Sequence, residues 1–136
     1  MEKVNLRLQE KYNTIARNET RWEEYFMEDA EMVITAYGTT ARIAKKSIKE
    51  LRKAGVKAGL IRPITLWPFP AEAINKAAAR AKAFLTVEMS CGQMVEDVRL
   101  AVNGQAPVEF FGRTGGMIPS WKEIYAAAEK ALGGVK

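Results

Sequence analysis

Histidine is absent from this sequence of 136 residues, and cysteine occurs once, as Cys91. Histidine is the usual general base and the commonest metal ligand of enzymes, so its absence excludes a Ser-His-Asp or Cys-His mechanism within the chain. One cysteine excludes a disulfide within the chain and any metal or iron–sulfur site built from four thiolates. We therefore expect no catalytic residue and no metal ligand here.

Long apolar runs are also lacking. No stretch approaches the ~20 apolar residues of a transmembrane helix, and the first residues do not resemble a signal peptide. The composition, 48% hydrophobic and 27% charged, is that of an ordinary globular domain. We expect a cytoplasmic protein that makes no contact with a membrane.

The formal charge of +5 raises the question of nucleic-acid binding. The basic residues are spread over helical segments and mixed with acidic ones, as in "KVNLRLQEKYNTIARNETRWEE" and "RIAKKSIKELRKAG". This pattern is typical of solvated helix faces, so we expect no nucleic-acid surface.

The chain divides into a leader and an alternating part. Val4, Leu8, Tyr12 and Ile15 lie on one face of a helix expected from about residue 2 to 17, and residues 1–29 are predicted to form a helical leader or linker. Residues 30–136 are predicted to form an α/β domain. Its expected strands are 32–37, 56–62, 83–88 and 107–111, and its expected helices are 39–55, one beginning near 70, 93–102 and one following 120.

Strands that alternate with crossover helices predict a parallel sheet covered on both faces, a three-layer α/β/α arrangement. Right-handed crossovers favour a doubly wound strand order of 2-1-3-4. The winding then reverses between the strand that ends at Tyr37 and the strand that ends at Glu88. We expect any ligand crevice to open at that point.

One side of this crevice is predicted to be the turn Gly38, Thr39 and Thr40 at a helix N-terminus, where free N–H groups favour an anion. The sequence lacks both G-x-G-x-x-G and G-x-x-x-x-G-K-[ST], so this is a weak candidate for an anion site. Thr39 or Thr40 as an ordinary N-cap is the favoured interpretation.

The other side is predicted to contain "VEMSCGQ", with Glu88, Cys91 and Gln93. A thiol at the start of a helix can be reactive, but without a histidine we interpret Cys91 as a small packing residue. Glu88, at a strand end, is expected to serve as a hydrogen-bonding group.

The stretch "LIRPITLWPFP" is the most informative feature of the sequence. Pro63 ends a strand and Pro70 suits the first turn of a helix, so both are explained locally. Trp67 and Phe69, on either side of Pro68, are not, and large aromatic residues at a strand end commonly anchor interfaces.

Three segments together resemble one known family: "AYGTTARIAKKSIKELRKAGVKAGLIRPITLWPFP", "VEMSCGQMVEDVR" and "FFGRTGGMIPS". Roughly residues 30–132 look like the second domain of the alpha subunit of 2-oxoacid:ferredoxin oxidoreductases, a domain related to the C-terminal domain of transketolase. The "GRTGG" ending, residues 112–116, favours the branched-chain (2-oxoisovalerate) type.

The resemblance implies a complex that decarboxylates a 2-oxoacid on thiamine diphosphate, passes electrons through iron–sulfur clusters to ferredoxin and releases acyl-coenzyme A. This chain is expected to bind none of these cofactors, because it lacks the G-D-G…N-N pattern and looks like a fragment, inactive alone. Its implied role is assembly with other domains or subunits. Trp67, Pro68, Phe69, Glu88 and Gln93 are the interface candidates, and a homodimer in isolation is compatible with them.

Two alternatives stay open at this point. The chain could be a stand-alone module that binds a small ligand or nucleotide at Gly38, Thr39 and Thr40. It could also be the C-terminal domain of another thiamine diphosphate enzyme.

Overall fold

The computed structural model describes residues 1–133. Its elements in chain order are α1 (Glu2–Glu19), β1 (Trp22–Tyr25), β2 (Met32–Thr35), α2 (Gly38–Lys53), β3 (Ala58–Pro63), α3 (Ala71–Ala78), β4 (Ala83–Glu88), α4 (Met94–Val102), β5 (Val108–Gly112) and α5 (Trp121–Gly133). Within residues 1–133, no helix combines the length and the apolar character needed to cross a membrane.

The five strands form one sheet in the order β1-β3-β2-β4-β5. The pairs β2–β3, β2–β4 and β4–β5 are parallel. If the four parallel strands β2, β3, β4 and β5 are numbered 1 to 4, their order in the sheet is the predicted 2-1-3-4. This confirms the doubly wound α/β fold.

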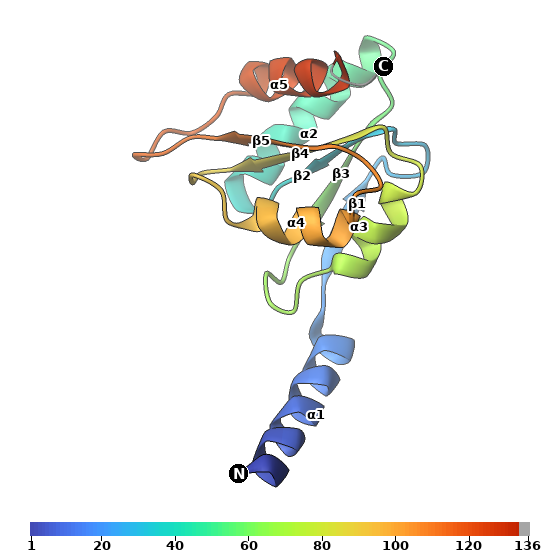
Figure 1. Ribbon diagram of the computed structural model, residues 1–136. Coiled ribbons are helices and arrows are strands. Elements are labelled where there is room, and N and C mark those ends of the chain that lie inside the picture. Colours follow the sequence, from blue (N-terminus) through green and yellow to red (C-terminus); the bar gives the residue numbers. More distant parts are fainter. Residues whose placement is uncertain (134–136) are drawn as a thin grey trace.

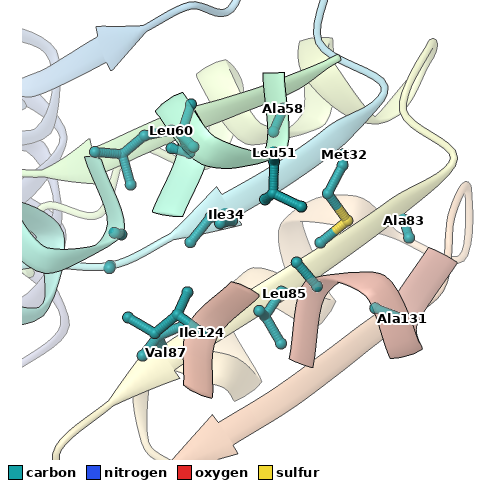
Figure 2. Packing of buried hydrophobic residues seen from close by; sticks show 14 of the residues in the cluster. Met32, Ile34, Leu51, Ala58, Leu60, Ala83, Leu85, Val87, Ile124 and Ala131 are labelled. Carbon is teal, nitrogen blue, oxygen red and sulfur yellow. The ribbon is translucent and has the colours of Figure 1, made fainter. Parts of the chain in front are cut away.

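Two layers of helices cover the sheet, α2 and α5 on one face and α3 and α4 on the other (Figure 1). Successive apolar side chains along each strand point to opposite faces of the sheet, so each face has its own cluster of buried side chains. Figure 2 shows the cluster under α2 and α5, where Ile34, Leu60 and Leu85 of the sheet face Leu51 and Ile124 of the two helices. Burying both faces holds the strand ends at one edge in fixed positions.

Strand β1 lies within residues 1–29, for which the sequence predicted only a helical leader or linker. It pairs antiparallel with β3, so that Trp22 lies opposite Pro63. Its four residues, WEEY, are two glutamates between two aromatic residues, and none is fully buried. Charged, short strands are typical of sheet edges, and such a strand gives little apolar signal in a sequence.

Helix α1 extends away from the α/β domain (Figure 1). None of its residues is buried, and the expected apolar face, which includes Val4, Leu8 and Tyr12, is exposed to solvent. The aromatic ring of Tyr12 meets the ring of Trp67 edge to face, with 5.9 Å between the centroids. Among residues 1–133, the apolar face of α1 therefore has no packing partner along most of its length.

Candidate functional site: the carboxyl edge of the sheet

The parallel strands all end at one edge of the sheet, which we call the carboxyl edge: the segments 36–38, 64–70, 89–93 and 113–120. Strands β2 and β4 are neighbours, and the connections leave them in opposite directions. The crevice predicted between Tyr37 and Glu88 therefore lies at the centre of this edge.

The turn at Gly38 begins α2, but the predicted cap is wrong. Tyr37 is the N-cap residue, and in the part of the chain that the structure describes no side chain caps this helix. The Thr40 hydroxyl instead donates a hydrogen bond to the carbonyl of Tyr37, at 2.6 Å, while Thr39 is exposed. Gly38 has a φ of 58°, a conformation that glycine adopts without strain. Beside this turn lies a hollow of about 110 Å³, which Met89 helps to line.

On the opposite side of the crevice, Glu88 fixes the start of α4 against the end of β4. Its side chain is completely buried, and its carboxylate accepts hydrogen bonds from the backbone N–H groups of Gln93, Met94 and Val95 at 2.8–3.3 Å. These groups form the first turn of α4, where the helix dipole favours a negative charge. The hydrogen-bonding role expected for Glu88 is therefore present. Because the side chain is enclosed, it offers no surface to a neighbouring subunit.

Gln93 is the N-cap residue of α4, and its side chain is exposed at the carboxyl edge. Cys91 is exposed as well, so the packing role expected for it is wrong. Gly92, between them, has a φ of 112°, which allows the chain to turn sharply from β4 into α4.

In the loop after β3, the two aromatic residues Trp67 and Phe69 lie in different environments. Trp67 is 63% exposed, whereas Pro68 is buried. Phe69 is half-buried and packs against the cluster under α3 and α4, so the prediction that the local fold does not need it is wrong. Pro70 precedes the first residue of α3, as the sequence indicated.

Sequence reasoning missed most of the apolar surface around Trp67. Exposed large apolar side chains follow three different strands at the carboxyl edge: Ile64, Leu66 and Trp67 after β3, Met89 after β4, and Met117 and Ile118 after β5. We call this set the apolar edge. Its signal in the sequence was positional, because each residue follows the end of a parallel strand by a few residues.

The polar groups near the end of β5 form an ion pair and a helix cap. Among residues 1–133 no group of three or more histidine, cysteine, aspartate or glutamate side chains could hold a metal ion. Arg113 forms an ion pair with Glu123 at 2.6 Å. A hydrogen bond from the Ser120 backbone N–H lowers the pKa of Glu123, with Arg113 contributing electrostatically. Ser120 and Glu123 form a capping box at the start of α5, because the Glu123 N–H in turn donates to the Ser120 hydroxyl.

Comparison with known proteins shows to which family this chain is related in sequence. Residues 30–124 match the family described as pyruvate:ferredoxin oxidoreductase core domain II. The chain is 44% identical over 133 residues to ketoisovalerate oxidoreductase subunit VorB of Methanothermobacter marburgensis. That alignment covers 98% of this chain and 38% of the relative, so the chain spans well under half of the relative's length.

Two solved structures share the fold. A 2-oxoglutarate:ferredoxin oxidoreductase from Magnetococcus marinus has a TM-score of 0.72 at 17% identity, over 88% of this chain and 21% of that one. The inactive β4 tetramer of a split-gene transketolase also has a TM-score of 0.72, at 21% identity, over 85% of this chain and 42% of that one. The relation to transketolase that the sequence implied is therefore confirmed at the level of the fold. By its sequence match over residues 30–124, the chain belongs to the pyruvate:ferredoxin oxidoreductase core domain II family.

Proposed function

We propose that this chain acts as the second domain of an alpha-type subunit in a cytoplasmic 2-oxoacid:ferredoxin oxidoreductase. The complex would oxidatively decarboxylate a branched-chain 2-oxoacid, 2-oxoisovalerate, to its acyl-coenzyme A with ferredoxin as the electron acceptor. The choice of substrate is supported by the ketoisovalerate oxidoreductase subunit, whose alignment covers 98% of this chain. Family membership over residues 30–124 supports the reaction class.

The cofactors of such a complex would be held by other parts of it. The hollow at Gly38, about 110 Å³, is far smaller than the roughly 300–1,000 Å³ of typical ligand pockets, so it does not fit thiamine diphosphate. A single cysteine does not fit an iron–sulfur cluster, which takes four thiolates. The chemical steps would therefore take place on cofactors held by other parts of the complex.

Its role would be to hold the assembly together through the apolar edge. The observation that carries the proposal is this edge, where six large apolar side chains from three loops are exposed. Stable subunit interfaces have an apolar centre with aromatic anchors, and Trp67 has the size and exposure of such an anchor. Packing against a neighbouring domain or subunit would remove these side chains from water.

The proposal can be tested by weakening the edge without disturbing the core. Trp67→Ser combined with Ile118→Ser alters two exposed side chains from two loops. The matched control is Leu100→Ser on α4, since Leu100 is 79% exposed and lies outside the apolar edge. Each variant would be mixed with the remaining domains and subunits of the oxidoreductase and followed by pull-down and size-exclusion chromatography.

We expect the double variant to lose co-elution and the control to retain it. Ferredoxin reduction that depends on 2-oxoisovalerate should appear only in the complete wild-type mixture. Unchanged assembly of the double variant would contradict the assembly role. Thermal stabilisation of the isolated chain by a small phosphorylated ligand would instead support a stand-alone binding module at Gly38.

In isolation, this chain is expected to form homodimers through the same edge, because exposed apolar patches promote association. Sedimentation should then show a dimer for the wild-type chain and a monomer for the double variant.

A further inference from the structure

The two outermost strands of the sheet differ in the residues that they expose. Strand β1 lies at one side of the sheet, and its two central residues are glutamates. Strand β5, VEFFG, lies at the other side, and its apolar residues Val108, Phe110 and Phe111 are only half-buried. Proteins protect exposed strand edges with charged residues, proline or a bulge. Strand β5 has one charged residue, Glu109, and no proline.

The hydrogen bonds between β4 and β5 determine which backbone groups of β5 remain free. The Phe84 N–H donates to the Pro107 carbonyl at 2.9 Å. The Arg113 N–H donates to the Glu88 carbonyl at 3.1 Å. In a parallel pair, the backbone groups of alternate residues face the neighbouring strand. With this register, the residues whose N–H groups face β4 are Glu109, Phe111 and Arg113.

The residues between them present their backbone to the outside of the sheet. The N–H and carbonyl groups of Val108, Phe110 and Gly112 point away from β4. None of these groups has a hydrogen-bond partner among residues 1–133. We call these three residues the open side of β5. Free donors and acceptors in such a row are the template to which a further strand adds.

A hollow adjoins β5 on the face of the sheet that α5 covers. Its volume is about 320 Å³. It is lined mainly by apolar side chains, with one residue of each charge sign, and includes Leu85, Phe111, Ala127, Ala131, Glu109 and Lys130. The side chains of an added strand would point alternately to the two faces of the sheet, so every second one would reach this face. Pockets for alternate side chains give strand addition its specificity.

We propose that the open side of β5 binds an extended segment of the neighbouring subunit, which adds to the sheet as a sixth strand and places an apolar side chain in the hollow. The identity of this partner rests on the proposed function. Strand β5 leads directly into the loop that carries Met117 and Ile118 of the apolar edge (Figure 1). A neighbour that covers these two side chains therefore lies beside the end of β5. Its backbone hydrogen bonds to β5 would fix the register in which it docks.

A proline at position 110 tests the outward N–H group without removing a bond to β4. Phe110→Pro removes both the ring and an outward N–H group, and proline is tolerated where an edge strand directs its N–H to solvent. The matched control, Phe110→Thr, removes the ring but keeps the N–H group and a high strand propensity. Each variant is mixed with the remaining domains and subunits of the oxidoreductase, and binding is followed by pull-down. Circular dichroism of each isolated chain checks that it is folded.

Hydrogen exchange of the wild-type protein supplies a readout that needs no variant. In the isolated chain, the amides of Glu109 and Phe111 are bonded to β4 and should exchange slowly, which makes them internal references. The amides that should exchange fast are those of Val108, Phe110 and Gly112. In the assembled complex, mass spectrometry at single-residue resolution should show these three outward amides slowed at least about tenfold.

We expect Phe110→Thr to bind the subunits as the wild-type chain does, and Phe110→Pro to bind about tenfold more weakly. Equal binding by the two variants overturns the proposal. Fast exchange of the three outward amides in an assembled complex also overturns it. Slow exchange of the same amides in the isolated chain overturns it as well, because it would show that the open side of β5 is already paired.

Failure of the proposed function gives a different result. An assembled complex that is inactive with every 2-oxoacid, but in which the outward amides are protected, would refute the oxidoreductase role and support the strand addition. An active complex with unprotected amides would do the reverse. A wild-type chain that co-elutes with no subunit would refute both.

Discussion

Replacing Glu88 with glutamine is expected to destabilise the domain severely, although the two side chains have almost the same shape. The Glu88 carboxylate is completely buried and accepts the N–H groups of Gln93, Met94 and Val95. A glutamine has only one acceptor oxygen, so its NH₂ group must face at least one of these donors. The variant therefore leaves a buried N–H group unpaired and removes the negative charge from the start of α4.

The magnitude follows from these two losses. An unsatisfied buried donor costs about 1–3 kcal/mol. A charge lost from a favourable, buried position at a helix N-terminus costs up to ~2 kcal/mol. Together they predict a decrease of about 1–5 kcal/mol in the free energy of unfolding, a large part of the roughly 5–15 kcal/mol of a typical domain.

Urea denaturation of the isolated chain, followed by circular dichroism, measures this difference. The matched control is Glu96→Gln, in the same first turn of α4 but exposed, which should change the free energy of unfolding by about 0.5 kcal/mol or less. A decrease below about 1 kcal/mol for Glu88→Gln, equal to that of the control, would refute the view that the buried carboxylate fixes the start of α4.

Two further predictions concern packing and acid sensitivity. Gly59→Ala should lower the free energy of unfolding by about 1–3 kcal/mol in thermal melts, because the added Cβ would meet the Met27 sulfur at 2.7 Å and the Phe26 carbonyl at 2.7 Å. Gly133→Ala, where a Cβ meets nothing within 4 Å, is its neutral control, and equal melts of the two variants would contradict the packing argument. The Ser120 N–H lowers the pKa of Glu123 below its ordinary value of 4.5, so Glu123 stabilises the fold above that pH, and its contribution is lost as the pH falls through the lowered value. Glu123→Gln should therefore flatten the decline of the free energy of unfolding as the pH falls below 4.5, and an unchanged pH profile would count against this cap.

The order of the parallel strands could be predicted because general rules for the connections between strands allow only a few strand orders. Each apolar strand was followed by a helix, and right-handed crossovers between parallel strands left 2-1-3-4 as the favoured arrangement. The capping box of α5 was predictable for the opposite reason, since Ser120 and Glu123 form it within one turn of the chain.

The parts that failed depend on contacts that a sequence does not display. Strand β1 exists because β3 offers an unpaired edge, not because WEEY forms a strand on its own. Thr40 was expected as a candidate N-cap, but its hydroxyl turns back to the Tyr37 carbonyl. Whether Phe69 packs inward and Trp67 outward depends on the path of a loop around Pro68, which no periodicity describes.

Strand β1 also has a practical consequence for defining the domain. The family match begins at residue 30, after this strand has ended. A polypeptide trimmed to that range would lose the partner of β3 and leave the backbone of an otherwise buried strand, AGLIRP, unpaired at the rim of the sheet. Unpaired strands of this kind add further strands from other molecules, so the trimmed polypeptide is expected to aggregate during expression. Truncations that keep residues 21–29 should avoid this outcome, because they retain the charged strand that closes the sheet.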